Sequence, residues 1–423
     1  MITIQYIREN KDEAIKRLAI RGLNVADTVE KIVAADAAKR KTQTELENTL
    51  AEANGLAKEI GGLFKSGQTD KANELKAQTA QLKEREKTLQ ADLEQQETGL
   101  YDLLVSLPNT PALFVPTGKT PEENVTVFEH GDIPTLHSGA KPHWELADQY
   151  KLIDFELGNK ITGAGFPVYT GKGAKLQRAL INFFLDEATK AGYDEVQVPL
   201  MVNAASGFGT GQLPDKEGQM YHATVDDLYL IPTAEVPITN LYRDVILKAE
   251  QFPIKNMGYT PCFRREAGSY GAHVRGLNRL HQFDKVEIVQ LQHPDKSYET
   301  LEDMKEHVKR LLVKLELPFR ILQLCGGDMG FASACTFDFE VYSTAQQRWL
   351  ECSSVSNFES FQANRLKLRF KDVDGKTKLA HTLNGSALAL PRIVAALLEN
   401  HQTPEGIRIP AALVPYTGFD IIN

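Results

Sequence analysis

The chain has 423 residues, of which 25% are charged and 42% hydrophobic, and its formal net charge is −8. This length is too great for a single hydrophobic core and predicts two or three domains. The negative charge excludes a general attraction to nucleic acid, so any RNA contact must come from a local basic patch. No apolar run is long enough to span a bilayer and the N-terminus lacks the layout of a signal peptide, so we expect a cytoplasmic protein with no membrane partner. The four cysteines form no CxxC pair, which argues against a disulfide framework or a zinc site.

Residues 25–100 contain neither proline nor tryptophan and are rich in alanine, glutamate, lysine, glutamine and leucine. Apolar residues recur at helical spacing over residues 46–63 and again over residues 75–100. Residues 65–70 break the pattern, and Thr69 or Asp70 is expected to cap the second helix. The pattern predicts an antiparallel coiled-coil hairpin whose arms are roughly 50–60 Å long at 1.5 Å per residue.

Lysines lie along the outer half of this hairpin, interleaved with glutamates. For most of them we expect only solvated coiled-coil surface. The functional alternative is that a few contact an RNA phosphate backbone without reading bases. The candidates are Lys58, Lys65, Lys71 and Lys76.

A loop-rich linker follows from residue 106 to about residue 141, and beyond it the chain mixes helix and strand signals. Residues 145–158 and 173–192 are predicted as helices, and residues 194–202 as an extended segment. A long helix that runs into a proline-terminated strand is compatible with a subunit interface.

Two segments carry side chains suited to an amino-acid substrate and a nucleotide. Thr233 and Glu235 share one face if their segment is extended, where they would accept hydrogen bonds from an ammonium group. The alternative there is an edge strand bounded by prolines. Residues 279–287 also read as a strand, which places Arg279, Phe283 and Glu287 on one face, each pair roughly 13 Å apart. A cation, an aromatic ring and a carboxylate would hold a phosphate, a base and an ammonium group, whereas the alternative is a solvated edge hairpin.

Two later segments offer further ligands for a nucleotide. Residues 336–342 alternate as a strand, and after a turn Glu351 and Ser354 present hard oxygen ligands of the kind that Mg²⁺ takes beside ATP phosphates. Serines and a glutamate are also common in ordinary turns. Residues 381–400 read as a polar, glycine-containing turn that leads into an apolar helix beginning near Pro391. Arg392 would then lie in the first helical turn, where it either binds a phosphate or points to solvent.

Taken together, these residues resemble the class II aminoacyl-tRNA synthetases and, among them, the bacterial-type seryl-tRNA synthetases. The resemblance covers essentially the whole chain, including residues 210–214, 233–235, 263–287, 382–392 and 413–416. It implies an α+β fold, in which a class II antiparallel β-sheet flanked by helices follows an N-terminal helical hairpin. The implied domains are a tRNA-binding hairpin at residues 1–106 and a catalytic domain at residues 107–423. Motif 1 would span about residues 175–199 and support a homodimer, motif 2 about 258–289, and motif 3 about 382–400.

The resemblance also implies a role for each candidate residue. Three arginines would serve catalysis. Arg264 would bind the serine carboxylate and the α-phosphate, and Arg279 and Arg392 would bind the β- and γ-phosphates. ATP would further contact Glu266, the Leu280 backbone and Phe283, with Mg²⁺ on Glu351 and Ser354. Serine would be bound by Thr233, Glu287, Asn384 and Ser386, with Glu235 supporting Thr233.

The implied reaction joins L-serine and ATP into seryl-adenylate and then charges tRNA(Ser), and by family expectation also tRNA(Sec). Small departures from the commonest family pattern lie at Asp215 and Lys216, at Ala272 and His273, and at Ser386. Three alternatives are a ligase that loads an amino acid onto a carrier protein, an RNA-binding pseudo-synthetase, and a coiled-coil scaffold with a vestigial domain. The N-terminal arm argues against the first, and the presence of all the candidate residues argues against the second and third.

Overall fold

The computed structural model describes residues 1–215, 217–266 and 275–423 of the chain. Its contacts divide the chain into two compact units. One unit contains residues 1–19 and 23–108, and the other contains residues 20–22 and 109–423. Within the described residues, no helix is both long and apolar enough to cross a membrane.

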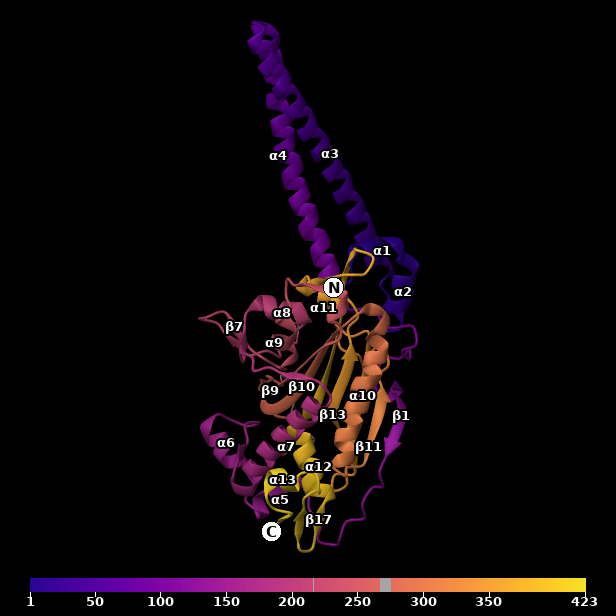
Figure 1. Ribbon diagram of the computed structural model, residues 1–423, viewed down its shortest axis with the longest axis vertical. Coiled ribbons are helices and arrows are strands. Elements are labelled where there is room, and N and C mark those ends of the chain that lie inside the picture. Colours follow the sequence, from indigo (N-terminus) through magenta and orange to yellow (C-terminus); the bar gives the residue numbers. More distant parts are fainter. Residues whose placement is uncertain (216, 267–274) are drawn as a thin grey trace. The chain divides into compact units, whose positions relative to one another are not determined.

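The first unit is helical and is dominated by a long antiparallel hairpin (Figure 1). Its helices are α1 Ile4–Glu9, α2 Lys11–Ala19, α3 Ala26–Lys65 and α4 Thr69–Ser106. Buried apolar side chains line the contact between the two long helices, including Leu46, Ala72 and Leu100. The predicted helical hairpin is therefore confirmed. The predicted cap is wrong, because Gln68 is the N-cap residue of α4 and makes no side-chain capping bond.

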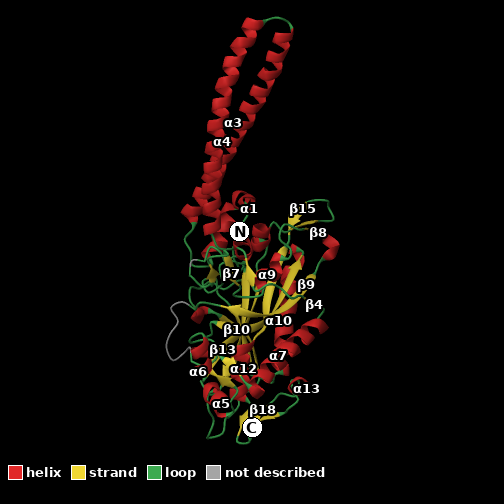
Figure 2. Cartoon of the chain, turned by 90° about the vertical axis from the view of Figure 1, so that its left-hand side faces the viewer, coloured by secondary structure: helices red, strands yellow, loops and turns green. Residues whose placement is uncertain are grey.

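The second unit is built on an eight-stranded sheet with the strand order β1-β11-β12-β13-β16-β10-β9-β4. Every neighbouring pair is antiparallel except β4 and β9. The strands are β1 Val125–His130, β4 Asp194–Glu195, β9 Ile254–Phe263, β10 Gln282–Gln292, β11 Phe319–Gln323, β12 Cys335–Ser343, β13 Arg348–Asn357 and β16 His381–Ala389. The predicted α+β fold with an antiparallel sheet is confirmed (Figure 2).

Three long helices pack on this sheet, namely α7 Gly171–Lys190, α10 Ser297–Lys314 and α12 Leu390–Asn400. The alternation of strand side chains divides β10 between two environments. Val286 and Ile288 are fully buried in the large core that includes these helices, whereas Val289 packs in a separate small cluster with Ala234 and Ile238. Lys285 and Glu287 share the face of Val289, so the sheet holds two charged side chains opposite its main core.

Short elements surround the sheet. The remaining helices are α5 His143–Gln149, α6 Phe155–Ile161, α8 Ala204–Thr210, α9 Glu235–Asn240, α11 Phe361–Leu366 and α13 Val414–Thr417. The remaining strands are β2 Ile153–Asp154, β3 Val168–Tyr169, β5 Met201–Val202, β6 His222–Ala223, β7 Leu228–Leu230, β8 Ile246–Lys248, β14 Arg369–Lys371, β15 Thr377–Leu379, β17 Gln402–Thr403, β18 Gly406–Arg408 and β19 Ile421–Ile422. Among the described residues, 3₁₀ turns lie at η1 Pro121–Glu123, η2 Ala249–Gln251 and η4 Pro294–Lys296.

Several local predictions differ from this structure. The helix predicted at residues 145–158 is broken into α5 and α6, because Lys151 adopts a positive φ of 51° and Asp154 caps a new helix through the Leu157 N–H. The extended segment predicted at residues 194–202 contains only the short strands β4 and β5. The turn predicted at the start of residues 381–400 is the strand β16, which lies between β13 and β10 and pairs with both. Tertiary pairing there overrides the local turn preference of Asn384 and Gly385.

Candidate active site

A cluster of buried polar side chains lies where β10 and β16 meet the segment before α9. The Glu287 carboxylate, only 2% exposed, accepts hydrogen bonds from Thr233 Oγ1 at 3.3 Å and Ser386 Oγ at 3.5 Å. Lys285 Nζ lies 2.6 Å from the same carboxylate oxygen and donates to Thr233 Oγ1 at 2.9 Å. A carboxylate, an ammonium group and two hydroxyls thus converge in one small site, which matches a ligand that carries both donors and acceptors.

Glu235 adds a second buried carboxyl group to this cluster. It is the first residue of α9, so the expectation that Thr233 and Glu235 share the face of one extended strand is wrong. Its backbone N–H instead donates to Thr233 Oγ1 at 3.2 Å, and its carboxylate accepts from Gln362 Nε2 at 2.6 Å. Burial and then the negative charge of Glu287 raise the pKa of Glu235 to about 7, against the opposing hydrogen bonds of Gln362 and Asn384. A cationic group bound here would relieve the repulsion between the two carboxylates.

An arginine and an aromatic ring adjoin this cluster. Phe283 lies opposite Cys262 in the β9–β10 pair, and Arg264 follows the end of β9. The Arg264 guanidinium carbon is 5.2 Å from the centroid of the Phe283 ring, and its Nε donates to the Pro232 carbonyl at 3.4 Å. Because β10 is flanked by both β9 and β16, the edge-hairpin alternative for this segment is excluded.

Arg279 lies outside this strand, which corrects the prediction that it shares a face with Phe283 and Glu287. Strand β10 begins at Gln282, and the Arg279 guanidinium pairs with the Glu266 carboxylate. Both side chains border a hollow of about 980 Å³, together with Trp144, Gly276 and Leu280. Its size is in the range of small-molecule pockets.

The third arginine, Arg392, is held against the sheet. It lies in the first turn of α12, as predicted, and that helix begins at Leu390 beside Pro391. Its Nη1 donates to the Glu351 backbone carbonyl at 2.5 Å and lies 3.5 Å from the Glu351 carboxylate. Its Nε donates to the Asn278 carbonyl at 3.3 Å. Arg392 therefore does not simply point to solvent.

Oxygen ligands for a cation gather beside Arg392. Glu351 and Ser354 lie on β13, and Asp338 is the register partner of Ser354 on β12. Asp338 Oδ1 is buried and has no hydrogen-bond partner among the described residues. Burial, and then the negative charge of Glu351, raise the pKa of Asp338 well above its usual range. An orphaned carboxyl oxygen beside a glutamate and a serine hydroxyl fits a hard divalent cation, because Mg²⁺ takes one or two carboxylates and completes its shell with water and phosphate.

Sequence reasoning missed three members of the site. Lys285 lies two residues from both Phe283 and Glu287, so the alternation of side chains along a strand would have placed all three on one face. Gln362 and Asp338 carried no local signal, since their importance arises from contacts with Glu235 and with the β13 ligands.

The four hairpin lysines, Lys58, Lys65, Lys71 and Lys76, are exposed on α3 and α4. Lys76 Nζ lies 4.7 Å from the centroid of the exposed Phe64 ring. Among the sequence departures, Lys216 and the pair Ala272 and His273 lie outside the described residues.

Comparison with known proteins identifies the family. Residues 1–111 match the model of the seryl-tRNA synthetase N-terminal domain, and residues 220–401 match the class II tRNA synthetase core domain for G, H, P, S and T. The chain is 48% identical to the serine--tRNA ligase of Salinibacter ruber, over 99% of this chain and 98% of that protein. It is 46% identical to the serine--tRNA ligase of Akkermansia muciniphila, over 100% and 99% of the two chains. A seryl-tRNA synthetase of Pyrococcus horikoshii, solved in complex with ATP, superposes with a TM-score of 0.94 at 33% identity, covering 100% of this chain and 99% of that one. The chain belongs to the seryl-tRNA synthetases, a class II aminoacyl-tRNA synthetase family.

Proposed function

We propose that this protein joins L-serine and ATP into seryl-adenylate, releases pyrophosphate, and transfers the seryl group to the 3′ end of tRNA(Ser), and also to tRNA(Sec). One observation carries the proposal beyond family membership. The buried cluster of Thr233, Lys285 and Glu287 lies on the same face of β10 as Phe283, four residues or about 13 Å along the strand from Glu287. An amino-acid pocket and a base-stacking surface thus lie within the span of one adenylate.

In the proposed first step, the serine carboxylate attacks the α-phosphate of ATP. That carboxylate is already ionised at neutral pH, so the step needs no general base, and catalysis consists of positioning and charge stabilisation. Arg264 would bind the serine carboxylate and the α-phosphate together. Arg279 and Arg392 would bind the β- and γ-phosphates, exchanging their present partners Glu266 and Glu351 for the nucleotide.

The adenine ring is proposed to stack on the Phe283 ring, whose position is fixed in part by its contact with the Arg264 guanidinium carbon at 5.2 Å. The Leu280 backbone and Glu266 would contact its edge. Glu351 and Ser354 would hold Mg²⁺, which when bound neutralises phosphate charge. The orphaned oxygen of Asp338 supports this assignment.

The serine ammonium is proposed to lie beside Thr233 and Glu287. Glu235 would support Thr233, whose Oγ1 accepts a hydrogen bond from the Glu235 backbone N–H. Asn384 and Ser386 would complete the pocket around the hydroxyl. Alanine would leave these buried polar groups unpaired, which such sites penalise strongly, and threonine would add a methyl group that has to clash.

The helical hairpin is proposed to bind tRNA through shape and phosphate contacts, with Lys58, Lys65, Lys71 and Lys76 as candidates. The domains are proposed as residues 1–106 for tRNA binding and 107–423 for catalysis. We further propose a homodimer formed through about residues 175–199, since α7 followed by a proline-ended segment has the layout of motif 1. Such a dimer would act in the cytoplasm, and light scattering of the purified protein tests its mass.

Pyrophosphate exchange into ATP tests the activation step. The wild-type protein and Arg264→Ala are compared in the presence of serine, threonine or alanine. We expect exchange with serine alone, and its loss in Arg264→Ala. Absence of exchange with all three amino acids would overturn the proposed activity and favour an RNA-binding pseudo-synthetase.

A further inference from the structure

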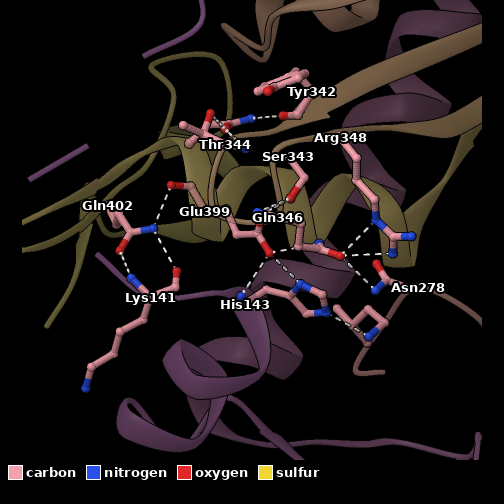
Figure 3. A network of polar contacts seen from close by, with 12 residues as sticks. Lys141, His143, Asn278, Tyr342, Ser343, Thr344, Gln346, Arg348, Glu399 and Gln402 are labelled. Atoms are coloured by element: carbon pink, nitrogen blue, oxygen red, sulfur yellow. Dashed lines mark hydrogen bonds and ion pairs between the residues drawn. The ribbon is translucent and has the colours of Figure 1, made fainter. Parts of the chain in front are cut away.

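A buried polar network, drawn in Figure 3, lies away from the reacting groups. Through Asn278 it reaches two of the proposed phosphate-binding arginines, Arg279 and Arg392. His143, at the start of α5, and Glu399, near the end of α12, are both fully buried, and His143 Nδ1 lies 2.7 Å from Glu399 Oε1. The residues are 256 positions apart in the sequence. An ionisable pair at zero exposure has to be satisfied by specific partners, because burying a charge without them is costly.

The partners of Glu399 are all donors. Its carboxylate accepts from the His143 backbone N–H at 3.0 Å, from Gln346 Nε2 at 3.1 Å and from the Ser343 hydroxyl. Burial alone would raise the pKa of Glu399, but the hydrogen bonds from His143 and Ser343 outweigh it and lower that pKa. Glu399 is therefore an ionised acceptor that fixes the ring of His143 and the amide of Gln346.

The other end of His143 reaches the segment that leads to Arg279. Its Nε2 accepts the backbone N–H of Leu277 at 2.9 Å, so the proton of the neutral ring lies on Nδ1 and points to Glu399. Gly276 has a φ of +68°, and a Cβ placed on it would lie 2.3 Å from His143 Nε2. Beside it, the Arg275 guanidinium carbon lies 4.9 Å from the centroid of the Trp144 ring. The start of α5 thus holds residues 275–277 at consecutive positions.

The second branch runs through Gln346 to the same segment. Gln346 Oε1 accepts from Asn278 Nδ2 at 3.0 Å and from Arg348 Nη2 at 2.9 Å. The carbonyl of Asn278 in turn accepts from Arg392 Nε. Asn278 is the residue immediately before Arg279, so one residue connects the network to both arginines.

We propose that His143, Glu399 and Gln346 are positioning residues, which fix residues 276–278 and so place Arg279 and Arg392 to bind the β- and γ-phosphates of ATP. This inference rests on the proposed function, since it assumes that these arginines bind ATP. Among the described residues, the side-chain hydrogen bonds of His143, Glu399 and Gln346 do not reach the Thr233–Glu287 cluster or Glu235, so loss of the network should affect ATP and spare serine.

Two substitutions separate the two contacts of His143. The side-chain amide of His143→Asn reaches about as far as Nδ1 and can still donate to Glu399, but it loses the Leu277 contact. The amide of His143→Gln reaches about as far as Nε2 and can still accept from Leu277. A third variant, Gln346→Ala, breaks the second branch at a partly exposed residue and leaves the His143–Glu399 pair in place. The control is His401→Gln, at another buried histidine near the end of α12, which is bonded to the Leu315 carbonyl instead.

The measurement is the KM for ATP and the KM for serine in pyrophosphate exchange, with circular dichroism to verify folding. We expect His143→Asn and Gln346→Ala to raise the KM for ATP about tenfold, the effect of one lost buried hydrogen bond. His143→Gln should retain most of the wild-type affinity, and His401→Gln all of it, with the KM for serine unchanged throughout.

Equal effects of His143→Asn and His143→Gln, or parallel changes in both KM values, would overturn the inference. If His143→Asn fails to fold, Gln346→Ala provides the test, and an unchanged KM for ATP in that variant would overturn the inference. A wild-type protein without exchange would refute the proposed function instead.

Discussion

Glu235→Gln is expected to stabilise the folded protein at alkaline pH while weakening serine binding. Burial and the charge of Glu287 raise the pKa of Glu235 from its ordinary value of 4.5 to about 7. The folded state therefore holds this proton more tightly than the unfolded state, and stability falls as the pH rises from about 4.5 to about 7. At 1.36 kcal/mol per pKa unit, the ionised carboxylate costs at most about 3 kcal/mol above pH 7.

The amide of Glu235→Gln keeps an oxygen for Gln362 and carries no charge, so it removes that cost. For a unit of this size, about 3 kcal/mol corresponds to a shift in melting temperature of about 5 °C. We expect the two proteins to melt together near pH 4.5, and the variant to melt higher by an amount that grows up to about pH 7.5. Differential scanning calorimetry from pH 4.5 to pH 8.5, without ligands, measures this difference.

Glu316→Gln provides a control of opposite sign. The hydrogen bond and charge of Arg408 lower the pKa of Glu316, so this carboxylate contributes stability that is present above its ordinary pKa and lost as the pH falls. Its substitution should therefore lower the melting temperature most at high pH. A gain in Glu235→Gln that is the same at every pH would refute the reasoning, because it would mean that packing and not charge decides the effect.

Three further predictions address the ATP, metal and tRNA contacts. Phe283→Leu should raise the KM for ATP about fivefold in pyrophosphate exchange, because the loss of the aromatic contact costs about 1 kcal/mol. An unchanged KM would show that Phe283 does not stack on adenine. Ser354→Ala should raise the Mg²⁺ concentration needed for half-maximal exchange without changing the KM for serine, and an unaltered Mg²⁺ titration would argue against a ligand role. A variant in which the four hairpin lysines are replaced by glutamine should keep wild-type pyrophosphate exchange but lose aminoacylation. A plot of the logarithm of the tRNA binding constant against the logarithm of the salt concentration should become shallower by about 0.7–0.9 per lost phosphate contact. An unchanged slope would mean that these lysines do not contact tRNA phosphates. The four positions are Lys58, Lys65, Lys71 and Lys76.

Periodicity predicted the parts of the molecule that depend on neighbours along the chain. The hairpin follows from heptad spacing, since apolar residues three and four apart lie on one helix face. The start of α12 follows from Pro391, which is tolerated only in the first turn of a helix. Periodicity did not predict the break in the helix expected at residues 145–158, because this break depends on the positive φ of Lys151, which the sequence does not reveal.

The site was predicted in part because its residues share strand faces. Phe283 and Glu287 follow from the alternation of β10, and the same alternation should have added Lys285. The remaining contacts connect distant segments, such as Glu235 with Gln362, 127 positions apart, and His143 with Glu399. No local pattern encodes them, since each side chain acquires its partner only when the strands and helices pack.

The buried carboxyl groups explain why the site has this composition in a protein of net charge −8. Glu235 and Glu287 are buried and Asp338 Oδ1 is shielded from water, whereas an apolar residue at each position would avoid the cost of removing a charge from water. Lys285 compensates Glu287, but Glu235 retains a raised pKa and Asp338 an unsatisfied oxygen. In the proposed site a cation would offset both deficits. The serine ammonium beside Glu287 would weaken its repulsion of Glu235, and Mg²⁺ would supply a partner for Asp338. Under the proposed function, part of the free energy of ligand binding would be the relief of repulsion and desolvation already present in the free protein. Substitutions that relieve them in advance should then gain stability at the expense of affinity.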